Sequence, residues 1–254
     1  NMEFKLNNKM VLSDYGKPYI VAELNTSHMG KMESAKEMIS KANDAGCDCV
    51  KFQSWSAGTL YSKSYYEENP IAKRFFKQLS FNEESLKELA DYCKSVGIGF
   101  SSTPYSRQEV DFLIEKCQVP YIKIASMDLT NLPFLEYIAK TNSPMVLSTG
   151  MGDMDEIITA VLAIQNAGNH NICLLHCTSI YPPELSTIRL RNILGLREKF
   201  PECAIGYSDH SIGTEIASAA VALGACMIEK HFTLDNSKIG IDNQMATEPE
   251  EMKQ

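Results

Sequence analysis

Eight short apolar segments, each followed by a stretch of helical character, recur along this chain and restrict its fold more than any other feature. Each segment is too uniformly apolar for a sheet with one face in water, which predicts parallel strands buried on both faces. The predicted strands are 19–23, 49–53, 99–103, 120–124, 144–148, 172–176, 203–206 and 226–229. Eight such units with no strand left over predict an α/β fold, a closed (β/α)8 TIM barrel rather than an open doubly wound sheet.

Both ends of the chain depart from this repeat. Two apolar runs, 4–6 and 10–12, precede it and are separated by polar residues, which predicts an N-terminal β-hairpin that can plug the bottom of the barrel. Near the other end, 247–250 has the signature of a helix start with a proline in its first turn, yet residue 254 is the last. We therefore expect a single domain over 1–254 with a truncated eighth helix, taken from a longer natural protein.

Composition narrows the class of partner. The 254 residues carry a formal net charge of −8, with Lys and Arg scattered, which argues against nucleic acid or an anionic membrane surface. No apolar run is long enough to cross a bilayer, and the first ten residues contain no signal-peptide core. The eight cysteines lie mostly inside apolar runs without a C-x-x-C pair, which is typical of reduced, buried thiols in a cytoplasmic protein.

Polar side chains follow the C-terminal ends of the predicted strands, where TIM barrels place their active sites. They include Glu23, Lys51, Gln53, Ser101, Thr103, Lys123, Ser126, Ser148, His176, Ser208, His210, Glu229 and His231. Lys51 and Lys123 have apolar neighbours in sequence, and a buried unpaired ammonium is costly, so we expect each to face an anion such as phosphate or carboxylate. The turn at 148–150 offers backbone N–H groups to the same anion, although a cap or turn is the simpler role for any one serine.

Two histidines follow neighbouring strands of the repeat, His210 after the seventh and His231 after the eighth. A single histidine at a strand end is more often a structural hydrogen-bonding residue, whereas two on adjacent strands favour a metal site. Neutral imidazole binds divalent cations well, and an open coordination shell suits Lewis-acid catalysis. We therefore expect a divalent metal there, with Mn²⁺ as the first candidate and Mg²⁺ or Co²⁺ as alternatives.

A set of short motifs covers nearly the whole chain in a fixed order. They are VAELN at 21–25 with His28 and Gly30, VKFQ at 50–53, STP at 102–104, IKIAS at 122–126, LSTGM at 147–151, HCTSIYP at 176–182, GYSDH at 206–210 and EKHFT at 229–233. Together they resemble the N-acetylneuraminate (sialic acid) synthase family, which condenses phosphoenolpyruvate with an N-acylated mannosamine-type sugar. Among its branches the chain is most similar to the one that makes legionaminic acid, a bacterial nonulosonate.

The resemblance implies roles for individual residues. The phosphoenolpyruvate-binding positions of the family fall on Lys51, Thr103, Lys123, Ser126, Ser148 and Ser208. Its metal ligands fall on His210 and His231. Its acid/base and sugar-handling positions fall on Glu23, Gln53, Tyr181 and Asp242, with Asp128 where the commoner members have Glu.

The chain departs from the family pattern in two places. Residues 240–246 read GIDNQMA where many members resemble Gly-Pro-Asp-His, so Asn243 and Gln244 predict a different sugar contact. Family members also usually carry a C-terminal antifreeze-like (SAF) domain, exchanged across a homodimer so that an Arg covers the partner's sugar, and we identify none in 1–254. We therefore expect a homodimer in the full-length form and a poor enzyme in the barrel alone.

The implied reaction is metal-dependent and joins C3 of phosphoenolpyruvate to the aldehyde of an open-chain sugar, giving a nine-carbon 2-keto acid and phosphate. Glu23 would stabilise the cation at C2 and help deliver water. Three alternatives stay open: a Schiff-base (class I) aldolase with Lys51 or Lys123 as the amine, another phosphoenolpyruvate-dependent 3-deoxy sugar acid synthase, and a non-catalytic sugar-phosphate binding barrel. The acyl pattern of the sugar and the identity of the metal are open as well.

Overall fold

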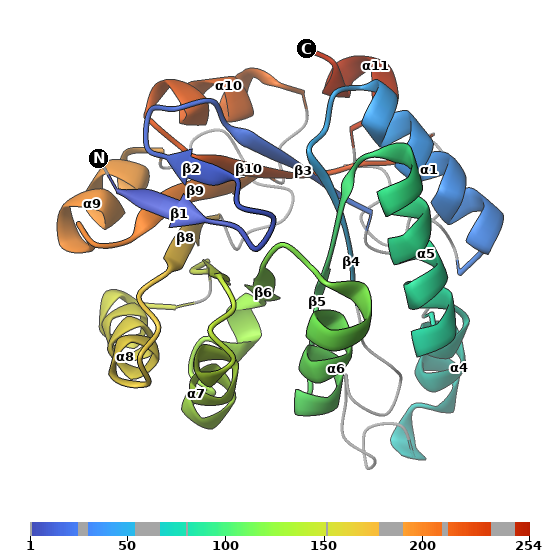
Figure 1. The fold of residues 1–254 in the computed structure, drawn as a ribbon, viewed down its shortest axis with the longest axis horizontal. Coiled ribbons are helices and arrows are strands. Elements are labelled where there is room, and N and C mark those ends of the chain that lie inside the picture. Colours follow the sequence, from blue (N-terminus) through green and yellow to red (C-terminus); the bar gives the residue numbers. More distant parts are fainter. Residues whose placement is uncertain are drawn as a thin grey trace.

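The structure is a computed structural model that describes residues 2–24, 30–53, 67–79, 81–150, 152–177, 190–209, 213–234 and 247–254. Its centre is a sheet of eight parallel strands in the order β5-β4-β3-β10-β9-β8-β7-β6, and the two end strands β5 and β6 lie side by side, so the barrel is nearly closed (Figure 1). The strands are β3 Tyr19–Glu23, β4 Cys49–Gln53, β5 Gly99–Thr103, β6 Ile122–Ile124, β7 Met145–Ser148, β8 Ile172–His176, β9 Ala204–Asp209 and β10 Met227–His231. The predicted TIM barrel is confirmed.

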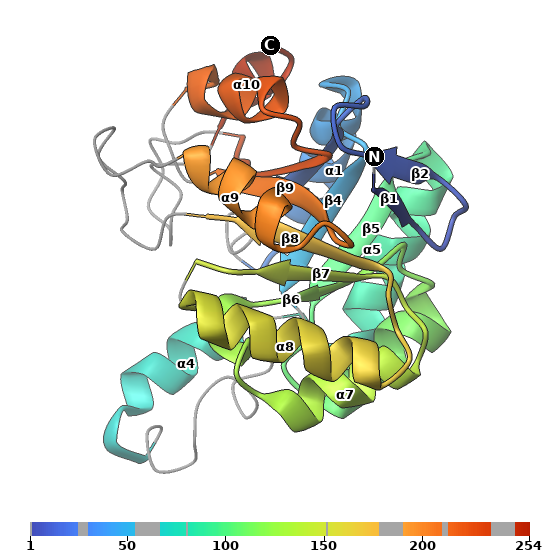
Figure 2. The same ribbon diagram turned by 90° about the vertical axis from the view of Figure 1, so that its left-hand side faces the viewer.

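Helices surround this barrel on its outer side, and α4 (Pro70–Leu79) extends away from it (Figures 1 and 2). They are α1 Met32–Asp44, α4 Pro70–Leu79, α5 Glu83–Val96, α6 Arg107–Phe112, α7 Leu132–Lys140, α8 Met154–Asn166, α9 Arg191–Lys199, α10 Glu215–Ala222 and α11 Pro249–Met252. After β10, the described part of the chain contains α11 of 4 residues, which is the short eighth helix that the sequence predicts. No helix in the described ranges has the length and apolar character needed to span a membrane.

Local sequence signals set the helix ends. Asn82 caps α5 by accepting a hydrogen bond from the Ser85 backbone N–H, and α5 ends at Gly97, whose φ of +87° suits a residue without a Cβ. Asp153 and Glu156 form a reciprocal capping box at the start of α8. Short-range hydrogen bonds therefore fix where α5 and α8 begin.

The predicted N-terminal hairpin is also present. β1 (Glu3–Lys5) pairs antiparallel with β2 (Val11–Ser13), and Phe4 lies opposite Leu12. Both side chains are buried in a cluster with inward residues of the barrel. The Asn7 backbone N–H donates to the Pro120 carbonyl, just before β6. The hairpin therefore covers the end of the barrel at which the strands begin (Figure 2).

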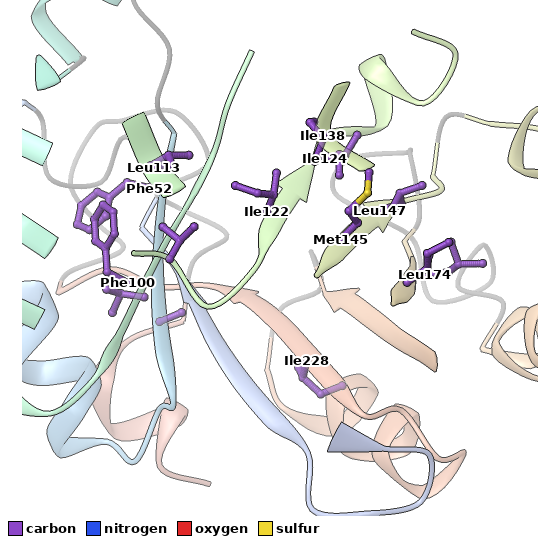
Figure 3. Close-up of a cluster of buried hydrophobic side chains, with 14 of the residues drawn as sticks. Phe52, Phe100, Leu113, Ile122, Ile124, Ile138, Met145, Leu147, Leu174 and Ile228 are labelled. Carbon is purple, nitrogen blue, oxygen red and sulfur yellow. The ribbon is translucent and has the colours of Figure 1, made fainter. Parts of the chain in front are cut away.

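The apolar core has two layers, because successive strand residues point to opposite faces. The outer layer packs between strands and helices and includes Phe52 and Phe100, whose rings stack with centroids 5.7 Å apart (Figure 3). The inner layer lies inside the barrel under the hairpin and includes Val21 and Val146. Six of the eight cysteines are buried and all eight are free, in agreement with the predicted buried thiols.

Candidate functional site

Four charged side chains meet inside the barrel, near the ends at which β3, β4, β6 and β10 finish. We call them the charged quartet: Glu23, Lys51, Lys123 and Glu229. Lys51 Nζ lies 2.5 Å from Glu23 Oε2 and 3.0 Å from Glu229 Oε2, and Lys123 Nζ lies 3.2 Å from Glu229 Oε1. The Ser208 hydroxyl donates to Glu229 Oε1 at 3.4 Å. None of the four residues is more than 5% exposed.

Strand alternation explains why these residues face one another. In β4, Val50 and Phe52 belong to the outer core, so Cys49 and Lys51 point into the barrel. In β10, Ile228 packs outward, so Met227 and Glu229 point inward. Each of these strands therefore places an apolar residue in the lower part of the barrel and a charge two residues later, near the mouth.

Two members of the quartet have pKa values that favour their charged forms, and the other two have pKa values shifted toward the neutral form. Burial alone would raise the pKa of Glu229, but the Lys123 and Lys51 ammoniums hold it well below its usual range. Burial would lower the pKa of Lys51, but Glu229 and Glu23 raise it above its usual value. Burial raises the pKa of Glu23, although Lys51 opposes this, and burial lowers the pKa of Lys123 despite the attraction of Glu229. Glu23 and Lys123 are thus the members best suited to proton exchange.

Hydroxyl groups surround the quartet at the ends of other strands. Thr103 ends β5, Ser148 ends β7 and Ser208 lies in β9, and all three are buried. Ser126 begins the 3-10 turn Ser126–Asp128 after β6. The site therefore combines two buried ammoniums with several neutral hydrogen-bond donors, a set that suits a small ligand bearing phosphate and carboxylate groups.

Comparison with known proteins identifies the family. A model of the NeuB family matches residues 38–254. The chain belongs to the NeuB family. It is 40% identical over 248 residues to N,N'-diacetyllegionaminic acid synthase of Campylobacter jejuni, covering 93% of this chain and 74% of that protein. It is 43% identical over 242 residues to an uncharacterized protein of Methanocaldococcus jannaschii, covering 94% of this chain and 69% of that protein.

A solved structure supports the same assignment. The crystal structure of N-acetylneuraminic acid (sialic acid) synthetase from Leptospira borgpetersenii serovar Hardjo-bovis, in complex with citrate, superposes with a TM-score of 0.90 at 32% sequence identity. The match covers 100% of this chain and 87% of that chain. The resemblance that the sequence motifs carry is therefore confirmed at the level of the family and of the barrel.

The NeuB motifs supply the residues of the quartet. We expected each lysine to face an anion such as phosphate or carboxylate, and in the structure carboxylates of the chain itself face both lysines. Lys123 and Glu229 are 106 positions apart, so their sequence neighbours give no sign of the pair. With every group in its usual charge state the quartet is neutral, and a ligand anion would join a balanced cluster.

Three residues that received no role from the sequence also lie at this site. Glu229 bridges the lysines. Cys177, just after β8, is half-buried. Burial raises the pKa of its thiol, whereas Lys123 and hydrogen bonds to Ser126 and the Gly150 backbone act to lower it. Burial also raises the pKa of Tyr105, which interacts electrostatically with members of the quartet. Cys177 is recognisable in sequence only by its place in the 176–182 motif.

The structure describes some of the remaining predicted site residues and leaves others outside the described ranges. Asp128 ends the 3-10 turn after β6, is half-buried, and has a pKa raised by burial against a hydrogen bond with Asn131. Gln53 is the last residue of β4. Outside the described residues lie the Gln53 side chain and all of Tyr181, Asp242 and His210.

The predicted metal site is only partly within the described structure. His231 ends β10, is half-buried, and pairs in register with Glu23 of β3. Among the described residues, no group of three or more His, Cys, Asp or Glu side chains is arranged to hold a metal ion. One imidazole is thus in place beside the quartet, and the two-histidine ligand set stays a prediction.

A second buried ion pair joins β10 and β9 on the outer side of the barrel. Lys230 Nζ is 3.2 Å from Asp209 Oδ2, and the two residues are also register partners between β10 and β9. Each of them immediately precedes one of the two predicted metal-ligating histidines in sequence. The pair fixes the ends of both strands and thereby the place from which His231 projects.

Proposed function

We propose that this chain condenses phosphoenolpyruvate with an open-chain N-acylated mannosamine-type sugar, giving a nine-carbon 2-keto sugar acid and phosphate. The observation that carries the proposal is the pair of buried lysines at the barrel mouth of a NeuB-family chain, joined by one carboxylate. Phosphoenolpyruvate carries a phosphate and a carboxylate, and each can accept charge-assisted hydrogen bonds from an ammonium. The name of the C. jejuni relative favours a legionaminic-type product.

The binding roles follow from position. We assign Lys51 and Lys123 to the two anionic groups of phosphoenolpyruvate, with Thr103, Ser126, Ser148 and Ser208 as neutral donors around them. Gly150 supports this arrangement, because a Cβ at this position would collide with Cys177 Sγ. The backbone of the β7–α8 turn can therefore approach β8 closely, where its N–H groups would be available to an anion.

The chemical roles follow from the quartet. As C3 of phosphoenolpyruvate bonds to the aldehyde carbon, the aldehyde oxygen takes up a proton and C2 becomes electron-deficient. Water then adds to C2 and gives up a proton before phosphate leaves with the electrons of the C2–O bond. We assign Glu23 to this step, because burial raises its pKa and so makes it a stronger proton acceptor than an exposed glutamate. Its charge also stabilises the cation at C2.

The proposal includes a divalent metal at His210 and His231, with Mn²⁺ as the first ion to test and Mg²⁺ or Co²⁺ next. When bound, such an ion would polarise the sugar aldehyde toward attack by the weakly nucleophilic enol. The half-buried imidazole of His231 supports this part of the proposal. The sugar-handling roles of Gln53, Asp128, Tyr181 and Asp242, and assembly as a homodimer, are likewise proposals that rest on family membership.

A Schiff-base aldolase is the second candidate, and one observation favours it. Burial lowers the pKa of Lys123, and an amine of lowered pKa is a better nucleophile at neutral pH. Borohydride treatment in the presence of pyruvate would attach pyruvate covalently to Lys123 in such an enzyme. The ion pair with Glu229 argues against it, because the carboxylate favours the protonated, non-nucleophilic form of the amine.

The test measures phosphate release from phosphoenolpyruvate against a panel of acylated mannosamine-type sugars, with the product mass determined in parallel. We expect release only with both substrates and a divalent ion, loss on chelation, and recovery with Mn²⁺. A Lys123→Met variant should bind phosphoenolpyruvate about ten- to a hundredfold more weakly, since a hydrogen bond to a charged group is lost.

The other outcomes separate the alternatives. A seven- or eight-carbon product would indicate a different 3-deoxy sugar acid synthase, and binding without phosphate release would indicate a non-catalytic barrel. Because the chain spans 69% and 74% of the length of the two relatives, the assay includes a chain extended to their full length. Equal turnover by the two lengths would contradict our expectation that the barrel alone is a poor enzyme.

A further inference from the structure

One carboxylate contacts three of the residues that we assign to phosphoenolpyruvate. Glu229 Oε2 lies 3.0 Å from Lys51 Nζ, while Glu229 Oε1 lies 3.2 Å from Lys123 Nζ and accepts from the Ser208 hydroxyl at 3.4 Å. These partners come from β4, β6 and β9, and Glu229 comes from β10. A single side chain thus connects donors from three other strands of the barrel.

We propose that Glu229 is a positioning residue, which sets the spacing and direction of the Lys51 and Lys123 ammoniums and the Ser208 hydroxyl for an anionic substrate. This inference rests on the proposed function. It assigns Glu229 no contact with the substrate, because a carboxylate repels the phosphate and carboxylate of phosphoenolpyruvate.

Electrostatics explains why such a residue is needed. Two ammoniums buried near each other repel, and this repulsion is stronger in the low-dielectric interior than in water. A carboxylate placed between them attracts both, so it favours the charged form of each lysine and turns both ammoniums toward the same centre. Glu229 divides its two oxygens between the two lysines, which fixes their relative position.

The surroundings of Glu229 hold it rigidly in this place. Its side chain is 7% exposed. The two residues beside it in β10 are both anchored on the outer face, Ile228 in the apolar core and Lys230 by its ion pair with Asp209. A preorganised set of donors requires this kind of support, since small errors in position weaken binding and catalysis strongly.

The experiment replaces Glu229 by Gln, which keeps the shape but removes the charge. An amide can accept only through one of its two terminal atoms, so it cannot place one acceptor atom against each ammonium. We expect phosphoenolpyruvate to bind about ten- to a hundredfold more weakly by calorimetry, with a parallel rise in its KM, while kcat and the KM of the sugar change much less. Glu229→Asp, which keeps the charge but shortens the reach, should recover part of the affinity.

Asp14→Asn is the matched control. Asp14 is also a buried carboxylate in an ion pair, with Arg197 Nε at 3.1 Å, and it accepts from the Ile205 backbone N–H. Its partners belong to α9 and the beginning of β9, away from the quartet. We expect this variant to lose stability while it keeps the wild-type affinity for phosphoenolpyruvate, which separates positioning from a general loss of folded protein.

The outcomes are distinguishable. Wild-type affinity and KM for phosphoenolpyruvate in Glu229→Gln would overturn the positioning role and leave the proposed function intact. Absence of both phosphoenolpyruvate binding and phosphate release in the wild-type protein would overturn the proposed function itself. If Glu229→Gln does not fold, Glu229→Asp decides, and an unchanged affinity in that variant overturns the inference.

Discussion

The two ends of the barrel interior are built by the same strands with opposite chemistry. At the bottom, under the hairpin, the inward side chains include Val21, Cys49 and Met227, which are fully buried and apolar. Two residues later in the same strands come Glu23, Lys51 and Glu229. One strand register therefore produces a packed plug at one end and a cluster of buried charges at the other.

The difference teaches how a fold can contain such a cluster. Removing charges from water is unfavourable, and ion pairing inside a protein often does no more than balance that cost. Burial of apolar side chains is favourable throughout, at about 25 cal/mol per Å². The apolar bottom of the barrel can therefore stabilise the fold, so the mouth can contain charged groups that bind anions without adding to stability.

The largest expected effect is at the mouth, in Lys51→Met. This change leaves Glu23 and Glu229 without their shared ammonium. Removing one partner of a buried pair costs about 3–5 kcal/mol, so the free energy of unfolding should fall by that amount in urea titration at pH 7. Binding of phosphoenolpyruvate should be lost as well.

A second substitution tests the reason for this effect. Adding Glu23→Gln to Lys51→Met removes one of the uncompensated carboxylates, so the double variant should recover part of the lost stability but not the binding. A double variant that is less stable than Lys51→Met would show that the penalty does not come from unpaired charge.

A smaller effect is expected at the bottom, in Leu12→Ala. The Leu12 side chain is buried against the inner core, and truncating a buried leucine costs about 2–5 kcal/mol. We expect the lower part of that range, because the hairpin can move inward to fill part of the cavity. Affinity for phosphoenolpyruvate should stay at the wild-type value, and a tenfold loss would mean that the two ends are coupled.

The strands could be predicted from sequence because their apolar runs are distinct. The predictions match β3, β4, β5 and β8 at both ends. β6 begins at Ile122 rather than 120, where the Pro120 carbonyl instead accepts a hydrogen bond from the hairpin residue Asn7. β9 continues to Asp209 rather than 206, since Ser208 and Asp209 pair with β10 despite their polar side chains. Apolar periodicity does not detect a strand that ends in polar residues.

The site could be predicted as a set of residues but not as a network. Position at the strand ends identified Lys51, Lys123 and Ser208, and the family motifs gave them roles. The link through Glu229 depends on closure of the barrel, which brings β10 beside β3 and β9 and within reach of Lys123 on β6. No local sequence pattern predicts such a contact, so the sequence assigned no role to the Glu229 carboxylate at the centre of the site.

The last and smallest effect concerns thiol reactivity at the two ends. Burial raises the pKa of Cys49, at the bottom, to about 12, so its reactive thiolate is scarce at pH 8. Burial also raises the pKa of Cys177, at the mouth, but this thiol is only half-buried, and the nearby Lys123 ammonium and its hydrogen bonds oppose the shift. We expect iodoacetamide to label Cys177 in the native protein and to label Cys49 only after unfolding, as measured by peptide mass spectrometry.

Phosphoenolpyruvate should reduce this difference by protecting Cys177, because we place the ligand against Lys123 and Ser126, both of which interact with Cys177. Saturating ligand should slow the labelling of Cys177 several-fold. Cys117, which is also half-buried and ends the π-helical segment Leu113–Cys117 after α6, serves as the internal control. Burial raises the pKa of its thiol to about 12, so it should label slowly, at a rate that the ligand does not change. Equal labelling of Cys49 and Cys177 in the native protein would show that the plug opens as readily as the mouth. Unprotected Cys177 at saturating ligand would mean that the anion does not bind beside β8.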